Sequence, residues 1–448
     1  MSNDLLSKGL SLVRGWFEPP PEKVLERIRD ELRECADLIG GEVSARQRAA
    51  KLAKTYAELD ENGRRAFLRI LLTEFGPEPE RIDAAYDAYR AARGSDEQWQ
   101  AEAALRESLR SPRSRILTQF SASDAGVHFL VDLRAELLDF LRDDPLLAPL
   151  DLELQGLLAS WFDVALLELQ RITWHSPADV LERLMQYEAV HEIESWQDLK
   201  NRLDSDRRCY AFFHPRMPSV PLIFVEVALT EGLAGDVQQL LDVSAPLFAT
   251  ERADTAIFYS ISNTQKGLRG ISFGHFLLKR VIDDLRRDFP KLERFATLSP
   301  IPGLVRWYRA HPEALADAFT ASDWRRLRAA GAPEGMELLQ RLLETPEIAG
   351  TEAWREALAA PLLRAAARYL LATENGRALD PVARFHLGNG ARIERLNWLA
   401  DTSPKGWRQS WAIMVNYRYE PDKLQDRIDA YERDGLIEAT SAVRRLAR

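Results

Sequence analysis

The sequence predicts an α+β protein in which a helical bundle precedes a domain built around a mixed sheet. Three observations predict this class. The chain has 448 residues, more than one ordinary domain holds. Over roughly the first 160 residues, apolar residues recur every three or four positions without any strand pattern. Further on, short β-rich runs alternate with helical patterns. We therefore expect a helical domain at 1–165 and a mixed-sheet domain with additional helices at 166–448.

Helix ends in the first domain are marked by short polar residues and by Gly and Pro. Gly76-Pro77 ends a strong helical pattern, and Trp174-His175-Ser176-Pro177 indicates a break before a helix that begins near Pro177. Side chains suited to capping helices lie at Asp60, Ser95, Ser121 and Ser176.

Strands are expected where β-branched and aromatic residues form short apolar runs, at 209–213, 222–229, 255–262 and 294–298. After Ser299 the chain should be helical again through Leu371. Glu226 lies within an apolar run, so its carboxylate needs a partner or must be neutral, and we do not expect it to be catalytic.

Composition excludes several classes of protein. The 69 acidic and 60 basic residues are interleaved and give a net charge of −9, which argues against nucleic acid as a partner. Cys35 and Cys209 are the only cysteines, so neither a disulfide framework nor a thiolate metal site is expected. The first residues lack a signal-peptide core, and no run is long enough to span a membrane. These features predict a cytoplasmic protein with no membrane partner.

The stretch 255–303 is the most informative part of the chain, because it orders a strand, a Gly-bearing loop, a helix and a second strand. From Phe273 onward the apolar residues follow helical spacing, and Pro290 ends the helix. Backbone N–H groups at a helix start can hold a pyrophosphate, and Gly267, Gly270 and Gly274 would allow close approach. The alternative is an ordinary helix-starting turn.

This order resembles the coenzyme A site of the N-acetyltransferase-like (GNAT) superfamily, although Gln265 and Arg269 do not complete its Gln/Arg-x-x-Gly-x-Gly/Ala pattern at the usual spacing. Four segments taken together, at 171–184, 214–233, 255–303 and 385–401, followed by Asn-Tyr-Arg-Tyr at 416–419, resemble malonyl-CoA decarboxylase. The likeness covers about the last 280 residues, and AIFYSIS, FPKLERFATLSPIPG and FHLGNGA carry most of it.

The resemblance implies a GNAT-like catalytic domain that converts malonyl-CoA to acetyl-CoA and carbon dioxide without a metal or organic cofactor. It implies that Ser299 is the proton acceptor, that His386 is the proton donor and that Tyr419 lies nearby. It also implies a substrate-binding loop made of Arg269, Gly270, Ile271, Ser272, Phe273, Gly274 and His275. Family members form tetramers as dimers of dimers through the helical domain, so a homotetramer is expected. The final residues are not a peroxisomal address, which suggests a bacterial-type cytosolic member.

Each site residue also has a structural interpretation. Ser299 could simply end a strand before Pro300, although a hydroxyl with a proton-exchanging neighbour can act in catalysis. His386 could be a core histidine, but an ordinary pKa of about 6.5 suits proton transfer near neutrality. The Leu-Gly-Asn-Gly that follows predicts a tight turn, with the imidazole at a strand end. Structural and functional roles are equally compatible with Tyr419, and His214 reads as structural.

Two other functions fit the same features. A GNAT-type acyltransferase would use the same cradle with acetyl-CoA and would need a pocket for an amine. A catalytically silent acyl-CoA sensor would bind a partner through its helical region, although the presence of both Ser299 and His386 argues against silence.

Overall fold

The computed structural model describes residues 21–37, 42–120, 126–162, 166–271, 277–333, 335–345 and 351–448. The chain divides into two compact units. The helical unit comprises Met1–Leu166, His214–Pro218 and Gln265–Ser272. The sheet unit comprises Leu167–Phe213, Ser219–Thr264 and Phe273–Arg448. None of the helices within the described ranges is long and apolar enough to cross a membrane.

The helical unit contains α-helices and two short 3-10 helices in its described part. They are α2 (Glu22–Ala36), α3 (Glu42–Glu58), α4 (Glu61–Glu74), α5 (Pro79–Ala92), α6 (Gln98–Ser108), α7 (Pro112–Phe120), α8 (Gly126–Phe140), η1 (Pro145–Leu147), α9 (Ala148–Trp161) and η4 (Lys266–Leu268).

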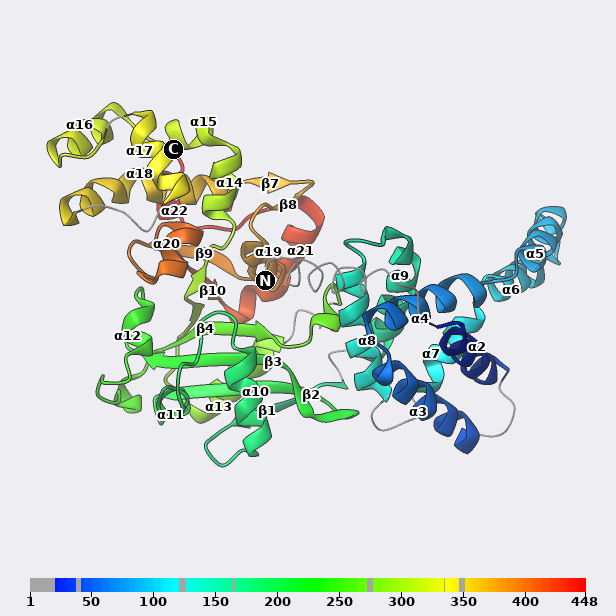
Figure 1. Cartoon of the computed structure of the whole chain (residues 1–448). Helices are drawn as coiled ribbons and strands as arrows, with labels where there is room; N and C mark the ends of the chain where they lie inside the picture. Colours follow the sequence, from blue (N-terminus) through cyan, green and yellow to red (C-terminus); the bar gives the residue numbers. More distant parts are fainter. Residues whose placement is uncertain are drawn as a thin grey trace, which may run out of the picture. The chain divides into compact units, whose positions relative to one another are not determined.

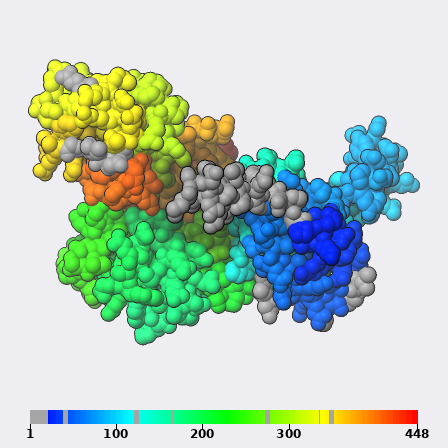
Figure 2. Space-filling model, in the orientation of Figure 1, coloured from blue at the N-terminus to red at the C-terminus, as the bar shows by residue number. Residues whose placement is uncertain are grey.

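Helix α4 shows how the sequence builds this unit. The Asp60 side chain accepts a hydrogen bond from the Gly63 N–H at 2.8 Å and caps the helix, as predicted. Phe67, Leu68 and Leu71 recur at helical spacing and are buried. In contrast, α5 buries none of its residues, and α5 and α6 form a hairpin that extends away from the other helices of the unit (Figures 1 and 2).

The sheet unit is built around one mixed sheet with the strand order β1-β2-β3-β4-β5-β10-β6, in which β9 also pairs with β10. Strands β4 and β5 run parallel, whereas β10 is antiparallel to β5, β6 and β9. The strands are β1 (Glu168–Ile172), β2 (Arg207–His214), β3 (Met217–Thr230), β4 (Thr255–Asn263), β5 (Arg294–Thr297), β6 (Ser299–Pro300), β9 (Arg392–Asn397) and β10 (Met414–Tyr419), with a separate pair β7 (Thr373–Glu374) and β8 (Arg377–Ala378).

Helices pack around this sheet and form a further helical layer after β6 (Figure 1). They are α10 (Ala178–Tyr187), α11 (Trp196–Arg202), α12 (Val237–Leu241), η3 (Thr250–Arg252), α13 (Leu277–Asp288), α14 (Leu304–Ala310), α15 (Pro312–Ala316), α16 (Ala321–Ala329), α17 (Met336–Glu344), α18 (Glu352–Leu371), α19 (Pro381–Gly388), α20 (Pro404–Ser410), η5 (Pro421–Lys423), α21 (Leu424–Asp434) and α22 (Ser441–Leu446).

The buried Glu226 of β3 finds the partner that its apolar setting requires. Its Oε2 atom lies 3.1 Å from Nη1 of Arg202, and both side chains are buried. Burial nevertheless raises the pKa of Glu226 to about 8, and the nearby Glu188 acts in the same direction. Glu226 therefore faces Arg202 of α11 and does not line the cavity described below, as expected for a structural carboxylate.

The predicted α+β class, with helices first and a mixed sheet afterwards, is confirmed. All four predicted strands are present, and the elements described between Ile301 and Leu371 are the helices α14 to α18. The predicted cap at Ser176 is wrong, because its hydroxyl accepts the Thr173 N–H and Pro177 itself precedes α10. Ser95 is also not a cap, since Glu97 precedes α6. Ser121, Phe273 and Phe276 lie outside the described residues.

Candidate active site

A cavity of about 250 Å³ lies within the sheet unit, between β4, the start of β6 and helix α19. Its lining is mostly apolar and aromatic and contains no lysine, arginine, aspartate or glutamate among the described residues. The lining residues are Val190, Phe258, Tyr259, Ser260, Ile261, Asn263, Ser299, Pro300, Pro381, Val382, Phe385 and His386. A negative charge placed here would therefore meet hydroxyl, amide and imidazole groups rather than a cation.

The structure brings Ser299 and His386 together at this cavity, and Tyr419 contacts His386 without lining the cavity. The Ser299 Oγ lies 3.1 Å from His386 Nε2, and His386 Nδ1 lies 2.7 Å from the Tyr419 hydroxyl. All three side chains are buried. They form one hydrogen-bonded chain along which a proton can pass.

Ser299 is held by the sheet. It begins β6, where it pairs with Val415 of β10, and the two-residue strand follows β5 after a single intervening residue, Leu298. The Leu298 N–H donates instead to the Phe258 carbonyl of β4. Ser299 was predicted to lie where a strand ends. It follows β5 after one residue but begins a second short strand, β6, and both strands pair with β10.

His386 lies in helix α19, so its predicted position at a strand end is wrong. The predicted turn is real, but it follows the helix: Asn389 is the C-cap, and Gly390 adopts a positive φ of 80°. The helix starts at Asp380-Pro381, where the Asp380 carboxylate accepts the N–H groups of Val382 and Ala383, both at 2.9 Å. An aspartate followed by proline is a recognised start signal, and it could have placed His386 on a helix.

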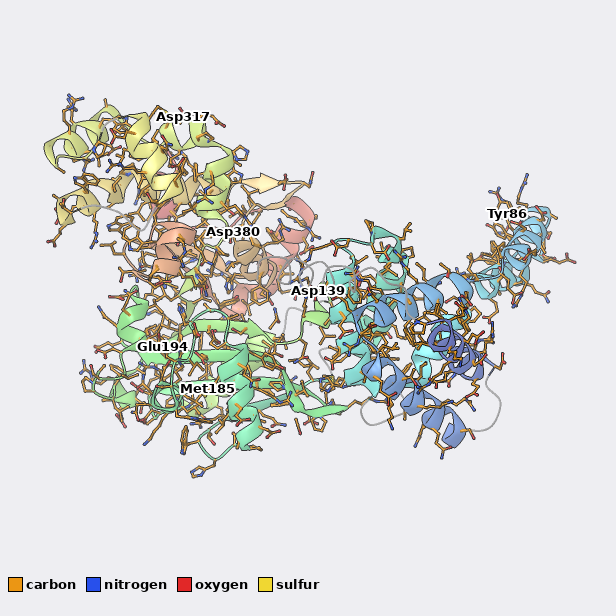
Figure 3. All side chains as sticks on the ribbon, viewed as in Figure 1. Tyr86, Asp139, Met185, Glu194, Asp317 and Asp380 are labelled. Carbon is orange, nitrogen blue, oxygen red and sulfur yellow. The ribbon has the colours of Figure 1, made fainter. Side chains whose placement is uncertain are left out.

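Asp380 itself is a residue that sequence reasoning missed. It is completely buried, and the Tyr369 hydroxyl of α18 donates to it at 3.3 Å. Burial raises the pKa of Asp380, and the two backbone donors oppose that shift. Gly303 lies beside this pair, since a Cβ there would overlap the Tyr369 hydroxyl. Figure 3 labels Asp380 among the crowded side chains at the start of α19.

Burial sets the protonation state of the site. It lowers the pKa of His386 to about 3, so the imidazole is neutral at pH 7. The expectation that this histidine titrates near neutrality is therefore wrong. Burial also raises the pKa of Tyr419 well above its ordinary value. The ring of Tyr417 stacks on the imidazole at 4.4 Å between centroids.

The Gly-bearing loop belongs to the helical unit, and only part of it is described. A Cβ on Gly267 would overlap the Val131 carbonyl oxygen of α8, so this glycine permits contact with a helix rather than with a ligand. Arg134 Nη1 donates to the carbonyls of Gly267 and Arg269 at 2.7 and 2.8 Å.

At the end of this loop, Gly270 has a φ of +80°, and Gln155 of α9 donates to its carbonyl at 3.0 Å. The Arg269 side chain is exposed, whereas Ile271 is buried. The predicted Ser272, Phe273, Gly274 and His275 lie outside the described residues.

His214 and the two cysteines lie in structural positions. His214 ends β2, and its Nε2 lies 3.1 Å from the Trp161 carbonyl, as expected for a structural residue. Cys35 and Cys209 are buried and unpaired. Across the described ranges, no three His, Cys, Asp or Glu side chains converge in a way that could hold a metal ion.

Two family models match the chain. The malonyl-CoA decarboxylase C-terminal domain matches residues 165–448, and the malonyl-CoA decarboxylase N-terminal domain matches residues 75–162. Mitochondrial malonyl-CoA decarboxylase from Anser anser anser is 37% identical over 418 residues, which covers 89% of this chain and 83% of that protein.

Solved structures agree with the family models. Malonyl-CoA decarboxylase from Rhodopseudomonas palustris is 38% identical, with a TM-score of 0.83 over 94% of this chain and 99% of that one. The enzyme from Agrobacterium vitis is 40% identical, with a TM-score of 0.82 over 94% of this chain and 100% of that one.

Proposed function

This chain belongs to the malonyl-CoA decarboxylase family, and we propose that it releases carbon dioxide from malonyl-CoA with a proton relay formed by Ser299, His386 and Tyr419. The chain is a carboxy-lyase that converts malonyl-CoA to acetyl-CoA. The observation that carries the proposed relay is the hydrogen-bonded chain of these three side chains at one apolar cavity.

The reaction makes two demands. Breaking the bond between the α-carbon and the carboxylate releases carbon dioxide and leaves the electron pair on the α-carbon as a thioester enolate. The enolate then takes one proton at the α-carbon, so each turnover consumes one proton from solvent. The site must orient the carboxylate for loss and then deliver a proton to carbon.

The apolar lining supports the first step. Phe258, Val382 and Phe385 line the cavity, and no cationic side chain in the described lining would neutralise the carboxylate. A carboxylate loses most of its hydration here and becomes neutral carbon dioxide on leaving, whereas the spread charge of the enolate needs less solvation. The cavity therefore favours the departure of the carboxylate over its retention.

The neutral state of His386 decides how the second step works. Because burial keeps the imidazole uncharged, the donor is not an imidazolium, and we assign the direct donation to carbon to Ser299 instead of the expected His386. In the relay, Ser299 gives its proton to the α-carbon, His386 Nε2–H restores the Ser299 proton, and Tyr419 donates to Nδ1. Solvent then returns a proton to Tyr419. The enolate carbon is a much stronger base than a phenolate, so the proton transfer is downhill once carbon dioxide has left.

We further propose that the loop from Arg269 to His275 holds coenzyme A and that the chain has domains at 1–165 and 166–448. The helical domain would join four subunits as a dimer of dimers in the cytoplasm. Exposed apolar residues on the α5–α6 hairpin support this assembly, since Trp99 and Tyr86 remain 72% and 49% exposed.

Incubation with malonyl-CoA in the absence of an amine acceptor tests the activity. Formation of acetyl-CoA is expected. An acyltransferase would need the amine, and a silent sensor would bind acyl-CoA without turnover. Replacement of His386 with Asn should preserve coenzyme A binding and remove most turnover, about 10² to 10⁴ in rate. Unchanged turnover in that variant would exclude the relay.

A further inference from the structure

A third hydroxyl extends the hydrogen-bonded chain on the side of Ser299 away from His386. Thr297 ends β5, and its Oγ1 lies 2.9 Å from Ser299 Oγ. The two residues are separated by one position, and their hydroxyls meet across the break between β5 and β6. Thr297 has no exposed surface, and it does not line the cavity. Any influence on the reaction must therefore act through Ser299.

The break in the sheet fixes the direction of the Thr297 hydroxyl. Strand β10 pairs with β5 at Arg418 and Tyr419 and with β6 at Met414 and Val415, which leaves the residues between them without a ladder partner on this side. The Tyr417 N–H donates to Thr297 Oγ1 at 3.1 Å, and the Asn416 side chain donates to the Thr297 carbonyl at 2.7 Å. The side chain of Thr297 thus fills the gap left by the missing ladder bond.

A backbone N–H can only donate, so Thr297 Oγ1 must act as an acceptor toward Tyr417. It also accepts a hydrogen bond from the Ser299 hydroxyl, whose Oγ lies 2.9 Å away. His386 Nε2 approaches the same oxygen at 3.1 Å. Thr297 Oγ1 therefore holds the Ser299 hydroxyl on one side, and the imidazole meets the same oxygen on the other.

We propose that Thr297 is a positioning residue that accepts a hydrogen bond from the Ser299 hydroxyl and thereby fixes Ser299 Oγ beside His386. This proposal rests on the proposed role of Ser299. A contact that orients the reacting hydroxyl without touching the substrate should affect kcat more than KM. The hydroxyl of Thr297, and not its methyl group, should matter.

Thr297→Val and Thr297→Ser separate the two groups. Valine keeps the shape and removes the hydroxyl, whereas serine keeps the hydroxyl and removes the methyl group. Thr297→Val should lower kcat for malonyl-CoA by about tenfold to a hundredfold, with KM and acetyl-CoA affinity nearly unchanged. Thr297→Ser should stay close to the parent enzyme. Full activity of Thr297→Val, or an equal loss in Thr297→Ser, would overturn the proposal.

The same valine substitution in a Ser299→Ala background tests whether Thr297 acts through Ser299. If it does, the second substitution should cause no further loss, because the oxygen that it serves is already absent. A full additional loss would indicate a purely structural effect and would refute the proposal. If Thr297→Val does not fold, Thr297→Ala is compared with Thr297→Ser and combined with Ser299→Ala in the same way.

The single variant Ser299→Ala distinguishes failure of this inference from failure of the proposed function. Normal turnover in Ser299→Ala would remove the role of Ser299 and, with it, that of Thr297. A large loss in Ser299→Ala together with normal turnover in Thr297→Val would leave the relay intact and exclude only Thr297.

Discussion

Replacing Asp380 with Ala should damage catalysis through the helix that carries His386. The carboxylate caps α19 through two backbone N–H groups and accepts the Tyr369 hydroxyl. Loss of a helix cap costs about 0.5 to 2 kcal/mol, and a buried hydroxyl left without a partner costs about 1 to 3 kcal/mol. The free energy of unfolding should therefore fall by about 1.5 to 5 kcal/mol. Because α19 then loses its anchor, His386 should also move relative to Ser299.

Asp236→Ala is a matched control, because Asp236 caps α12 of the same unit through the N–H groups of Gln238 and Gln239. Urea unfolding and malonyl-CoA turnover are measured for both variants at a temperature where both are folded. Asp236→Ala should lose about 0.5 to 2 kcal/mol of stability and keep its turnover. Asp380→Ala should lose turnover even when fully folded. Normal turnover in folded Asp380→Ala, or an equal loss in Asp236→Ala, would refute the anchoring role.

Three further predictions concern protonation, the loop and assembly. Because the pKa of His386 is about 3, its neutral form should keep kcat/KM level from about pH 5 to pH 8, and a decline that starts near pH 6.5 would contradict a neutral donor. The same shift should lower stability as pH falls from about 6.5 toward 3, since only the unfolded chain gains the proton, and His386→Asn should reduce this dependence in urea titrations. Gly270→Val should weaken malonyl-CoA binding. Gly94→Val, at a glycine with a similar φ of +81°, should impose comparable backbone strain without weakening binding. Equal affinities of the two variants for malonyl-CoA would argue against a coenzyme A loop. Trp99→Glu should lower the molecular mass measured by light scattering from that of a tetramer to that of smaller species, and Leu247→Glu, at another exposed apolar residue, should not. A parent protein that is monomeric would exclude the assembly.

Strands β2 to β5 were predictable because each contains a short apolar run with β-forming residues, and β4 is buried along most of its length. Strand β1 was missed because its Glu-Leu-Gln-Arg-Ile sequence is mostly exposed and carries no apolar run. Strands β6 to β8 have two residues each, too few for any pattern to appear. Helix α19 has only eight residues, so its periodicity was also too short to recognise.

The candidate site shows a different limit. Ser299 and His386 were identified by family resemblance, whereas their contact across 87 positions depends on how β6 and α19 pack. The neutrality of His386 follows from complete burial, which no local pattern reveals. Gly267 illustrates the opposite error, because its small size serves contact with α8. The local sequence shows that a glycine allows close contact at this position, but only the packing shows whether the contact is with a helix or with a ligand.

Decarboxylation by Ser299→Ala, measured beside acetyl-CoA binding, tests the central mechanism most directly. The substitution removes the hydroxyl that joins the cavity to His386 and leaves the loop from Arg269 to His275 unchanged. Malonyl-CoA turnover should fall by at least about a hundredfold, or roughly 3 kcal/mol, while isothermal titration shows acetyl-CoA binding as in the parent enzyme. Near-normal turnover would show that Ser299 only begins its strand, and loss of acetyl-CoA binding would show that it shapes the pocket instead of transferring a proton.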